Sequence, residues 1–189
     1  MLKEVSQKRL GTLLSLFQQC NGCVDFHLFL IPDEIKDNDI HRMAAIAGME
    51  EERLRWEEYA DRFGDPHRPR DSRWLIDYDE RLATGQPIDV DTFLSTKEVN
   101  DYVNKGYEDV FFDPVYGCSN EQRKQLKDLF PKMNEALFGG LYIPLQIVSW
   151  STEWSNYFAA GKEWWGAYLW TVHRPGSKQI AWIGASATD

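Results

Sequence analysis

The sequence predicts an α+β fold in which a mainly antiparallel C-terminal sheet packs against several helices. The chain has 189 residues, of which 43% are hydrophobic and 27% charged, as in a globular protein that can bury one core. Strand-like runs lie early and late in the chain, and helical periodicity fills the middle. This order favours α+β over a repeating βαβ series. We expect residues 1–189 to form a single domain.

The N-terminal part predicts a helix followed by a buried strand. Apolar residues recur at helical spacing over residues 2–19, and Asn21-Gly22 supplies a helix stop. Residues 23–31 (CVDFHLFLI) then predict a strand, on which Asp25 and His27 share one face as a hydrogen-bonded or surface pair. This early strand could join the C-terminal sheet.

The acidic middle of the chain, about residues 33–113, predicts mainly helices. Residues 40–47 and 49–63 each have helical character, and Gly48 is expected to interrupt them. The second helix carries the i,i+4 pairs Glu51–Arg55 and Glu58–Arg62 in the favourable orientation. Such a charge pattern is typical of a solvated helix first and of an interface second.

Local signals predict the remaining elements before the C-terminal sheet. Residues 64–70 contain the Gly and Pro residues of a loop. A short strand over 73–78 and a turn with an extended piece over 84–94 are expected after it. A helix over 97–105 should be opened by the capping-box spacing of Ser95 and Glu98. A further helix, capped by Ser119 and Gln122, is expected from 121 through a kink at Pro131 to 137.

The aromatic-rich C-terminal part, about residues 139–189, predicts strands at 141–150, 164–173 and 178–185. In the second of these both alternating faces are apolar, as in a strand covered on both sides. Residues 174–178 (RPGSK) predict the hairpin connection to the third. The connection 151–163 interleaves Trp154, Tyr157 and Phe158 with polar residues. Core anchoring of this loop is the favoured interpretation, and a binding surface is the alternative.

Cysteine usage and hydropathy favour a cytoplasmic protein. The chain has an odd number of cysteines (Cys20, Cys23 and Cys118), which fits a reducing compartment. The single C-x-x-C motif lacks the second half of a zinc site. We therefore interpret Cys20 and Cys23 as packing residues. The N-terminus lacks the features of a signal peptide, and no apolar run is long enough to span a membrane.

No metal or cofactor motif is evident in the sequence. The four histidines are scattered, and the doublets Asp77-Tyr78-Asp79 and Asp89-Val90-Asp91 do not continue into a calcium loop. Glycine-rich phosphate loops, dinucleotide fingerprints and nucleophile elbows are absent as well. We expect no bound cofactor and no metal.

The uneven charge of the chain suggests the kind of partner. Residues 33–113 contain 22 Asp and Glu against 11 Lys and Arg, within a chain of net charge −9. This sign disfavours direct binding of nucleic acid and suits a basic protein partner. The leading hypothesis is a small acidic binding module that sequesters or regulates such a partner, in the manner of a bacterial antitoxin or immunity protein. Its expected binding residues are Asp77, Asp79, Glu80, Asp89 and Asp91, with Trp154 and Tyr157 as desolvated anchors.

The alternative hypothesis is a small enzyme that acts on a polar, sugar-like or nucleoside-like substrate. Glu153 and Glu163 flank the aromatic connection, and His173 ends the following strand. Paired carboxylates beside apolar rings can have separated pKa values and act as acid and base. The absence of a catalytic motif makes the binding module the preferred hypothesis. A purely structural subunit is the third possibility.

Overall fold

The computed structural model describes residues 2–35, 37–63, 75–95, 97–99, 102–163 and 165–187. It confirms an α+β fold with one six-stranded antiparallel sheet and a separate two-stranded hairpin. The strands are β1 (Lys3–Glu4), β2 (Val24–Leu30), β3 (Gly85–Ile88), β4 (Lys97–Val99), β5 (Tyr102–Asn104), β6 (Gln146–Trp150), β7 (Ala167–His173) and β8 (Gln179–Ser186). The helices are α1 (Ser6–Gln19), α2 (Asp37–Phe63), α3 (Val90–Leu94), α4 (Tyr107–Phe112), α5 (Asn120–Phe138) and α6 (Ala159–Lys162), with short 3₁₀ turns η2 (Glu80–Leu82) and η3 (Asn156–Phe158).

The sheet has the order β1-β2-β8-β7-β6-β3, so the early strand β2 joins the C-terminal strands as the sequence allowed. β2 pairs antiparallel with β8 from Val24 opposite Ala185 to Leu30 opposite Gln179. β7 and β8 form the expected hairpin, with Ala167 opposite Ser186. The last strand in the sequence therefore lies inside the sheet, paired on both of its edges.

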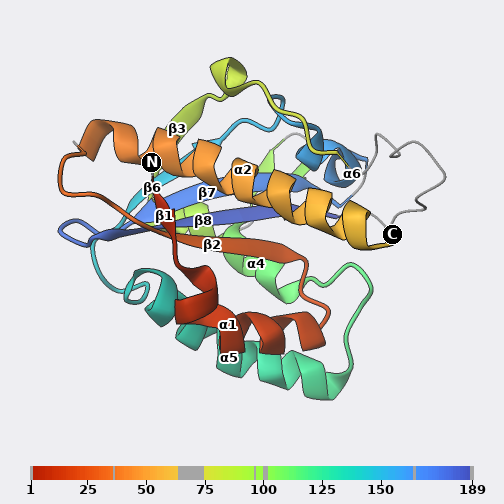
Figure 1. Ribbon diagram of the computed structural model, residues 1–189. Coiled ribbons are helices and arrows are strands. Elements are labelled where there is room, and N and C mark those ends of the chain that lie inside the picture. Colours follow the sequence, from red (N-terminus) through yellow and green to blue (C-terminus); the bar gives the residue numbers. More distant parts are fainter. Residues whose placement is uncertain are drawn as a thin grey trace.

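Helices cover both faces of the sheet (Figure 1). α2 crosses one face, where Met49, Trp154 and Trp182 are buried together. α1, α4 and α5 cover the opposite face, where Phe26 and Trp170 belong to a second apolar cluster. Alternate residues of β7 enter the two clusters, which confirms that this strand is covered on both sides. Trp164 lies outside the described residues.

The prediction of two helices interrupted at Gly48 was wrong, because α2 runs without a break from Asp37 to Phe63. A Cβ atom at Gly48 would lie 2.4 Å from the Trp182 ring. Glycine at this position therefore allows the helix to approach the central strand β8 closely. Its function is in packing, and the local helix-breaking signal is overridden by this contact.

Other predicted elements also differ from the structure. The extended piece expected up to residue 94 ends in the helix α3. Residues 3–4 form β1 rather than the start of the first helix, because they pair with Leu30 and Phe29 of β2. The helix expected over 97–105 is instead the β4–β5 hairpin, so strand pairing took precedence over the local capping-box spacing. The strand expected over 73–78 is a single bridge between Tyr78 and Ser155 where the chain is described, and its start lies outside the described residues.

Of the remaining helices, α5 was predicted correctly and α4 was not predicted. α5 begins with the expected capping box of Ser119 and Gln122 and continues through Pro131. It ends at Gly139 in the left-handed conformation. α4 was not predicted, because its short sequence YEDVFF mixes acidic and apolar residues without a full helical period. Within the described residues, no helix has both the length and the hydropathy needed to cross a membrane.

Candidate functional site

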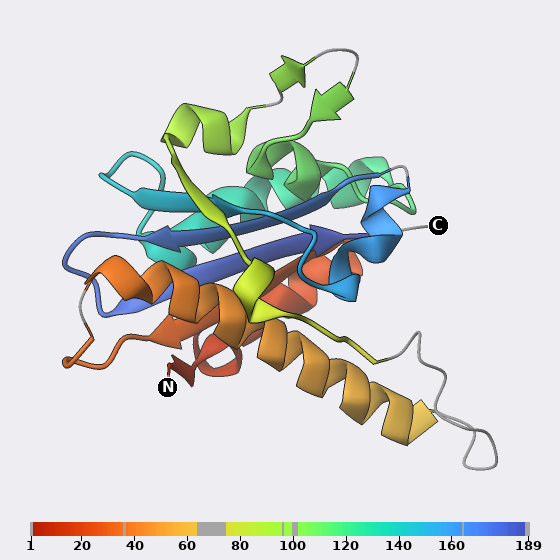
Figure 2. The same cartoon turned by 90° about the horizontal axis from the view of Figure 1, so that it is seen from above.

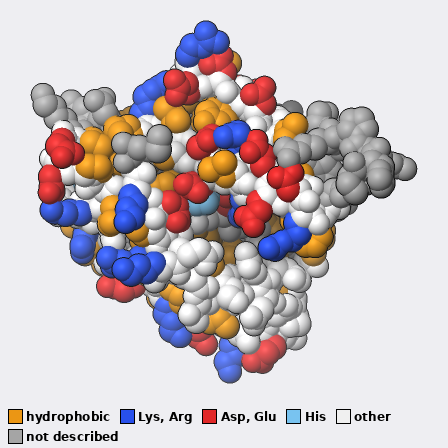
Figure 3. Space-filling model, in the orientation of Figure 1, with side chains coloured by type: hydrophobic (Ala, Val, Ile, Leu, Met, Phe, Trp, Pro, Cys, Tyr) orange, Lys and Arg blue, Asp and Glu red, His pale blue; other side chains and the backbone are white. Residues whose placement is uncertain are grey.

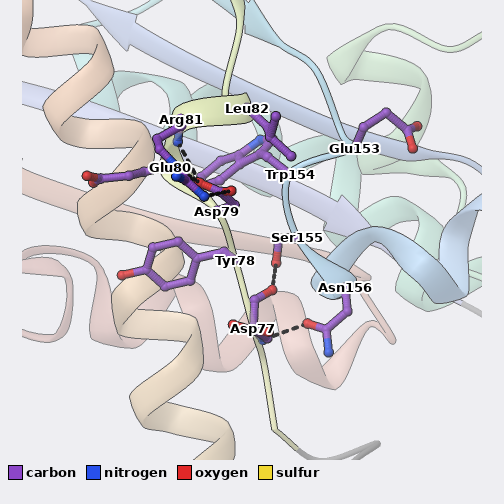
Figure 4. Close-up of a pocket in the computed structure, with 10 residues that line it drawn as sticks. All are labelled: Asp77, Tyr78, Asp79, Glu80, Arg81, Leu82, Glu153, Trp154, Ser155 and Asn156. Carbon is purple, nitrogen blue, oxygen red and sulfur yellow. Dashed lines mark hydrogen bonds and ion pairs between the residues drawn. The ribbon is translucent and has the colours of Figure 1, made fainter.

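Two segments far apart in the sequence line one hollow on the surface, which we call the acidic hollow. Its volume is about 620 Å³. The lining residues are Asp77, Tyr78, Asp79, Glu80, Arg81, Leu82, Glu153, Trp154, Ser155 and Asn156 (Figure 4). The fold thus joins the acidic residues predicted around position 79 with the aromatic connection predicted around position 154.

Main-chain pairing fixes the two segments side by side. The Asp79 amide donates to the Trp154 carbonyl at 2.8 Å, and the Asn156 amide donates to the Asp77 carbonyl at 3.2 Å. The side chain of Asn156 accepts from the Asp77 amide at 2.8 Å, and the Ser155 hydroxyl donates to the Asp77 carbonyl at 3.0 Å. These bonds hold the backbone of Asp77 and leave its side chain exposed.

Carboxylates give the hollow its charge. Arg81 binds Asp79 with two side-chain bonds of 2.8 and 2.7 Å, and these, together with the Arg81 amide, lower the pKa of Asp79 to about 2. Glu153 pairs with Lys162 at 2.9 Å but remains 79% exposed. Figure 4 shows Glu80 and Glu153 pointing to opposite sides of the hollow. The hollow therefore has acidic side chains on two rims.

The aromatic residues of the connection are mostly part of the core. Trp154 is 2% exposed, and its indole nitrogen donates to the Ser151 carbonyl at 2.7 Å. Tyr157 is partly buried, and its hydroxyl donates to Asp25 at 2.6 Å. These contacts support the interpretation of the connection as a core anchor. Neither ring is free to act as the desolvated anchor proposed from the sequence.

Asp89 and Asp91 do not line the acidic hollow. The Asp89 side chain caps α3 by accepting from the Thr92 amide at 2.7 Å, and Asp91 lies in the first turn of that helix. β3 separates them from η2, as Figure 2 shows. Asp89 thus has a structural function as a helix cap.

The structure separates His173 from the two glutamates of the enzyme hypothesis. Glu153 and Glu163 lie before the start of β7, whereas His173 is the last residue of that seven-residue strand. His173 is 3% exposed and contacts Gln146 and the Ser177 carbonyl, each at 3.1 Å. A strand of this length separates its ends by roughly 20 Å. No group of three potential metal ligands is found among the residues that the structure describes.

A second hollow lies between α1 and α2, and we call it the His27 cleft. Its volume is about 480 Å³. Its floor is formed by Val24, Asp25, Phe26 and His27 of β2. Figure 3 shows this face of the molecule, with acidic side chains around a recessed histidine. The sequence predicted that Asp25 and His27 share a face, and both turn toward α2.

A network of charged side chains surrounds His27. The Nε2 atom of His27 lies 2.8 Å from Glu52 Oε1, and Nδ1 lies 3.9 Å from Glu4, which is an ion-pair distance and too long for a hydrogen bond. Arg55 bonds Asp25 at 2.9 Å and lies 2.5 Å from Glu52 Oε2. The network thus joins β1, β2 and α2.

Carboxylates reverse the effect of burial on the pKa of His27. Burial alone lowers this pKa, but Glu4 and Glu52, together with the charge of Asp25, raise it to about 9. Burial and the charge of Asp25 raise the pKa of Glu52, while His27 and Arg55 act in the opposite direction. We assign the cationic form to His27 at neutral pH, since it faces three carboxylates.

Glu52 is the most unusual member of the network, because its side chain is fully buried. Its Oε2 atom has Arg55 close by, but the contact does not have hydrogen-bond geometry, and no other described residue donates to that oxygen. Sequence reasoning missed this residue, since it expected Arg55 to pair with Glu51. The polar Asp25 and His27 in an otherwise apolar strand were the signal that a charged partner lay opposite.

Comparisons with protein-family models, curated proteins and solved structures give no match for this chain. The two hollows and their chemistry are therefore the basis for a functional assignment.

Proposed function

We propose that the protein is a binding module for a basic protein partner and that the acidic hollow is its principal contact. One observation carries this proposal: the acidic residues near position 79 and the segment 153–156, remote in sequence, line the same surface hollow. Exposed carboxylates on two rims attract a cationic partner over a distance set by the ionic strength. Such complementarity mainly speeds association and selects the partner.

The hollow also offers an apolar contact beside its charges. Leu82 lines it and is 56% exposed, whereas Trp154 is buried beneath the surface. Binding energy is concentrated at residues that become desolvated at the centre of an interface. We therefore assign the anchoring contact to Leu82 in place of Trp154 and Tyr157. The carboxylates around it would meet Lys or Arg of the partner.

The backbone of the hollow supports a preorganised surface. The Arg42 guanidinium donates to the carbonyls of Glu80 at 2.6 Å and Ala83 at 2.9 Å, which ties η2 to α2. Tyr78 donates to Glu50 at 2.9 Å, a second link to the same helix. A surface held in this way loses little conformational entropy on binding. Sequestration of a basic protein, as an antitoxin or immunity protein does, is the function that this arrangement serves in our proposal.

Affinity capture from a lysate of the source organism tests the proposal. The wild type is compared with the triple variant Asp77→Asn, Asp79→Asn, Glu80→Gln at low and at high salt. We expect a stoichiometric basic protein on the wild type, and its loss both in the triple variant and at high salt. Leu82→Ala should weaken capture by increasing the rate of dissociation.

A second triple variant controls for net charge. Glu108, Asp128 and Glu135 are exposed residues of α4 and α5, away from the acidic hollow. Their replacement by Gln, Asn and Gln removes the same three charges. Retention of the partner by this control, with loss by the hollow variant, places the contact at the acidic hollow. Equal retention by both variants would remove the hollow from the interface.

A further inference from the structure

The β2 strand has an edge that the sheet leaves partly open. β1 pairs with it only at Leu30 and Phe29. The next contacts are the Val5 amide donating to the Leu28 carbonyl at 2.8 Å and the Leu28 amide donating to the Ser6 hydroxyl at 2.7 Å. The chain then leaves the edge as α1.

The open part of this edge faces the His27 cleft. Main-chain groups of alternate residues in a strand point to the same edge, so Val24 and Phe26 present theirs beside those of Leu28. Within the described ranges, no residue bonds these groups on that edge. Phe26 is only 4% exposed, yet it lines the cleft. Buried backbone groups without partners are rare in folded proteins, and here they open into a cavity.

The walls of the cleft match an extended chain that bears basic and apolar side chains. α1 contributes Gly11, which leaves room, and the apolar Leu14. α2 contributes Leu54, which is 45% exposed. The ionisable residues that line the cleft are the carboxylates Glu4, Asp25, Glu51 and Glu58, with His27 and Arg55 as the basic groups. The lining therefore has an acidic excess even when His27 is charged.

Glu51, on the α2 wall, lies near other carboxylates. Burial raises the pKa of Glu51, and the charges of Glu4 and Glu50 raise it further against the opposing effect of His27. A bound cation would relieve this repulsion. Glu58 lies beyond Glu51 on the same wall and is exposed.

We propose that the His27 cleft binds an extended basic segment of the partner protein, which adds to the sheet as a strand along the open edge of β2. Donors and acceptors spaced as in a strand are matched by another main chain, and pockets for alternate side chains then select the sequence. Lys or Arg side chains on one face of the segment meet Glu51 and Glu58 of α2, and apolar side chains on its other face meet Leu14 of α1. The proposal rests on the proposed function, because it names a second contact with the same class of partner.

The test uses a synthetic octapeptide of alternating lysine and valine, with blocked ends, and the ¹⁵N-labelled protein. Because main-chain pairing does not depend on side-chain identity, this generic probe is sufficient. We expect the amide signals of Val24 and Phe26 to shift. Hydrogen exchange of the Phe26 amide should slow by about tenfold or more at saturation. A peptide of alternating glutamate and valine should do neither.

Two variants at Gly11 test whether the peptide binds in the cleft, because one fills the cleft and the other leaves it open. A Cβ atom at Gly11 meets only the end of the Gln7 side chain, at 3.5 Å, so the position accepts a side chain. Gly11→Phe places a ring in the cleft. It should lower the affinity for the lysine–valine peptide by about tenfold or more, as expected for loss of strand pairing. Gly11→Ala makes the same backbone change, leaves the cleft open and should bind as the wild type does.

The acidic hollow and the His27 cleft are distinguished by the triple variant of residues 77, 79 and 80. If the cleft is the peptide site, this variant binds the lysine–valine peptide with unchanged affinity. Loss of binding in the triple variant but not in Gly11→Phe would overturn the inference. Unchanged exchange of the Phe26 amide in the wild type at saturating peptide would overturn it as well, whether or not Gly11→Phe folds. Protection of Phe26 together with failed capture from lysate would reject the proposed function alone.

Discussion

His27 lies on strand β2 beneath helix α2, and His41 lies on α2 itself, on the same face of the sheet. The pKa values of these two histidines shift in opposite directions. Burial lowers the pKa of both. Around His27, Glu4 and Glu52 outweigh burial and raise the pKa to about 9. Around His41, the nearby charge of His173 adds to the effect of burial, and the pKa falls to about 4. The neighbours supplied by the fold, rather than burial itself, decide the charge of each histidine.

The hydrogen bonds of His41 suit a neutral ring. Its Nδ1 atom lies 2.8 Å from the Thr171 hydroxyl, which also accepts from the Trp150 indole at 3.0 Å. A hydroxyl engaged in this way can donate its proton to His41. Thus α2 stabilises a charged histidine through Glu52, just past its middle, and carries a neutral histidine near its N-terminal end.

Replacement of Glu52 by Gln should have the largest effect. The change leaves His27 buried beside an uncharged group, and breaking a buried pair in this way costs about 3 to 5 kcal/mol. The pKa of His27 should fall toward its ordinary value. Urea unfolding measures the first effect and NMR titration of the imidazole the second. Glu58→Gln, at an exposed position with a 4.0 Å contact to Arg62, is the control and should change stability by less than about 0.5 kcal/mol.

Alkaline pH should weaken the wild type through His27. Since the folded pKa of about 9 lies above the ordinary 6.5, the stabilisation is complete below pH 6.5 and is lost as pH rises through 9. It amounts to about 3 kcal/mol. The urea midpoint measured from pH 6 to 10 should therefore decrease, and Glu52→Gln should flatten this dependence. A flat profile in the wild type would contradict the cationic assignment.

Gly48→Ala should disturb the part of α2 that lies between the two histidines. The new methyl group would lie 2.4 Å from the ring of Trp182, which is fully buried. Overpacking of this kind costs about 1 to 3 kcal/mol. Gly11→Ala is a matched helical glycine with space around it and should stabilise by about 0.5 to 1 kcal/mol. Thermal unfolding of the pair should give shifts of opposite sign.

Acid pH should have the smallest effect of the series, through His41. Its folded pKa of about 4 lies below 6.5, so the unfolded chain takes up the proton first, and stability falls as pH decreases from 6.5 toward 4. Because His41 is only partly buried, we expect a loss of about 1 to 2 kcal/mol. His41→Gln should remove this component between pH 4 and 6.5. An unchanged acid profile in that variant would assign the loss to other groups.

The sequence predicted the elements that have a strong period or a clear cap. β2, β7, β8 and α5 were found because burial on both faces or a capping box leaves a local signature. It failed at Gly48, whose importance depends on Trp182, and at residues 3–4, which form a strand only because β2 is beside them. Contacts between distant segments leave no local signal.

The same limit applied to the two candidate sites. Asp77, Asp79 and Glu80 were selected by charge, and the fold places them with Trp154 in one hollow. The sequence does not decide whether Trp154 is buried or exposed, since a tryptophan in a polar loop is compatible with either position. Glu52 was not predicted as a site residue, because its importance comes from its contact with His27, which lies on another element. Asp25 and His27 on the β2 strand were the sequence signal that indicated this network.

The position of β8 between β2 and β7 has a consequence for biosynthesis. β2 is complete at residue 30, but its partner begins at residue 179. At the usual rates of translation, β2 waits for roughly 7 to 30 s with its main-chain groups unpaired on that side. During this interval the nascent chain exposes an apolar strand, and shielding by a chaperone would be of most use then. A ribosome paused before residue 179 should therefore carry a chain that proteases digest readily.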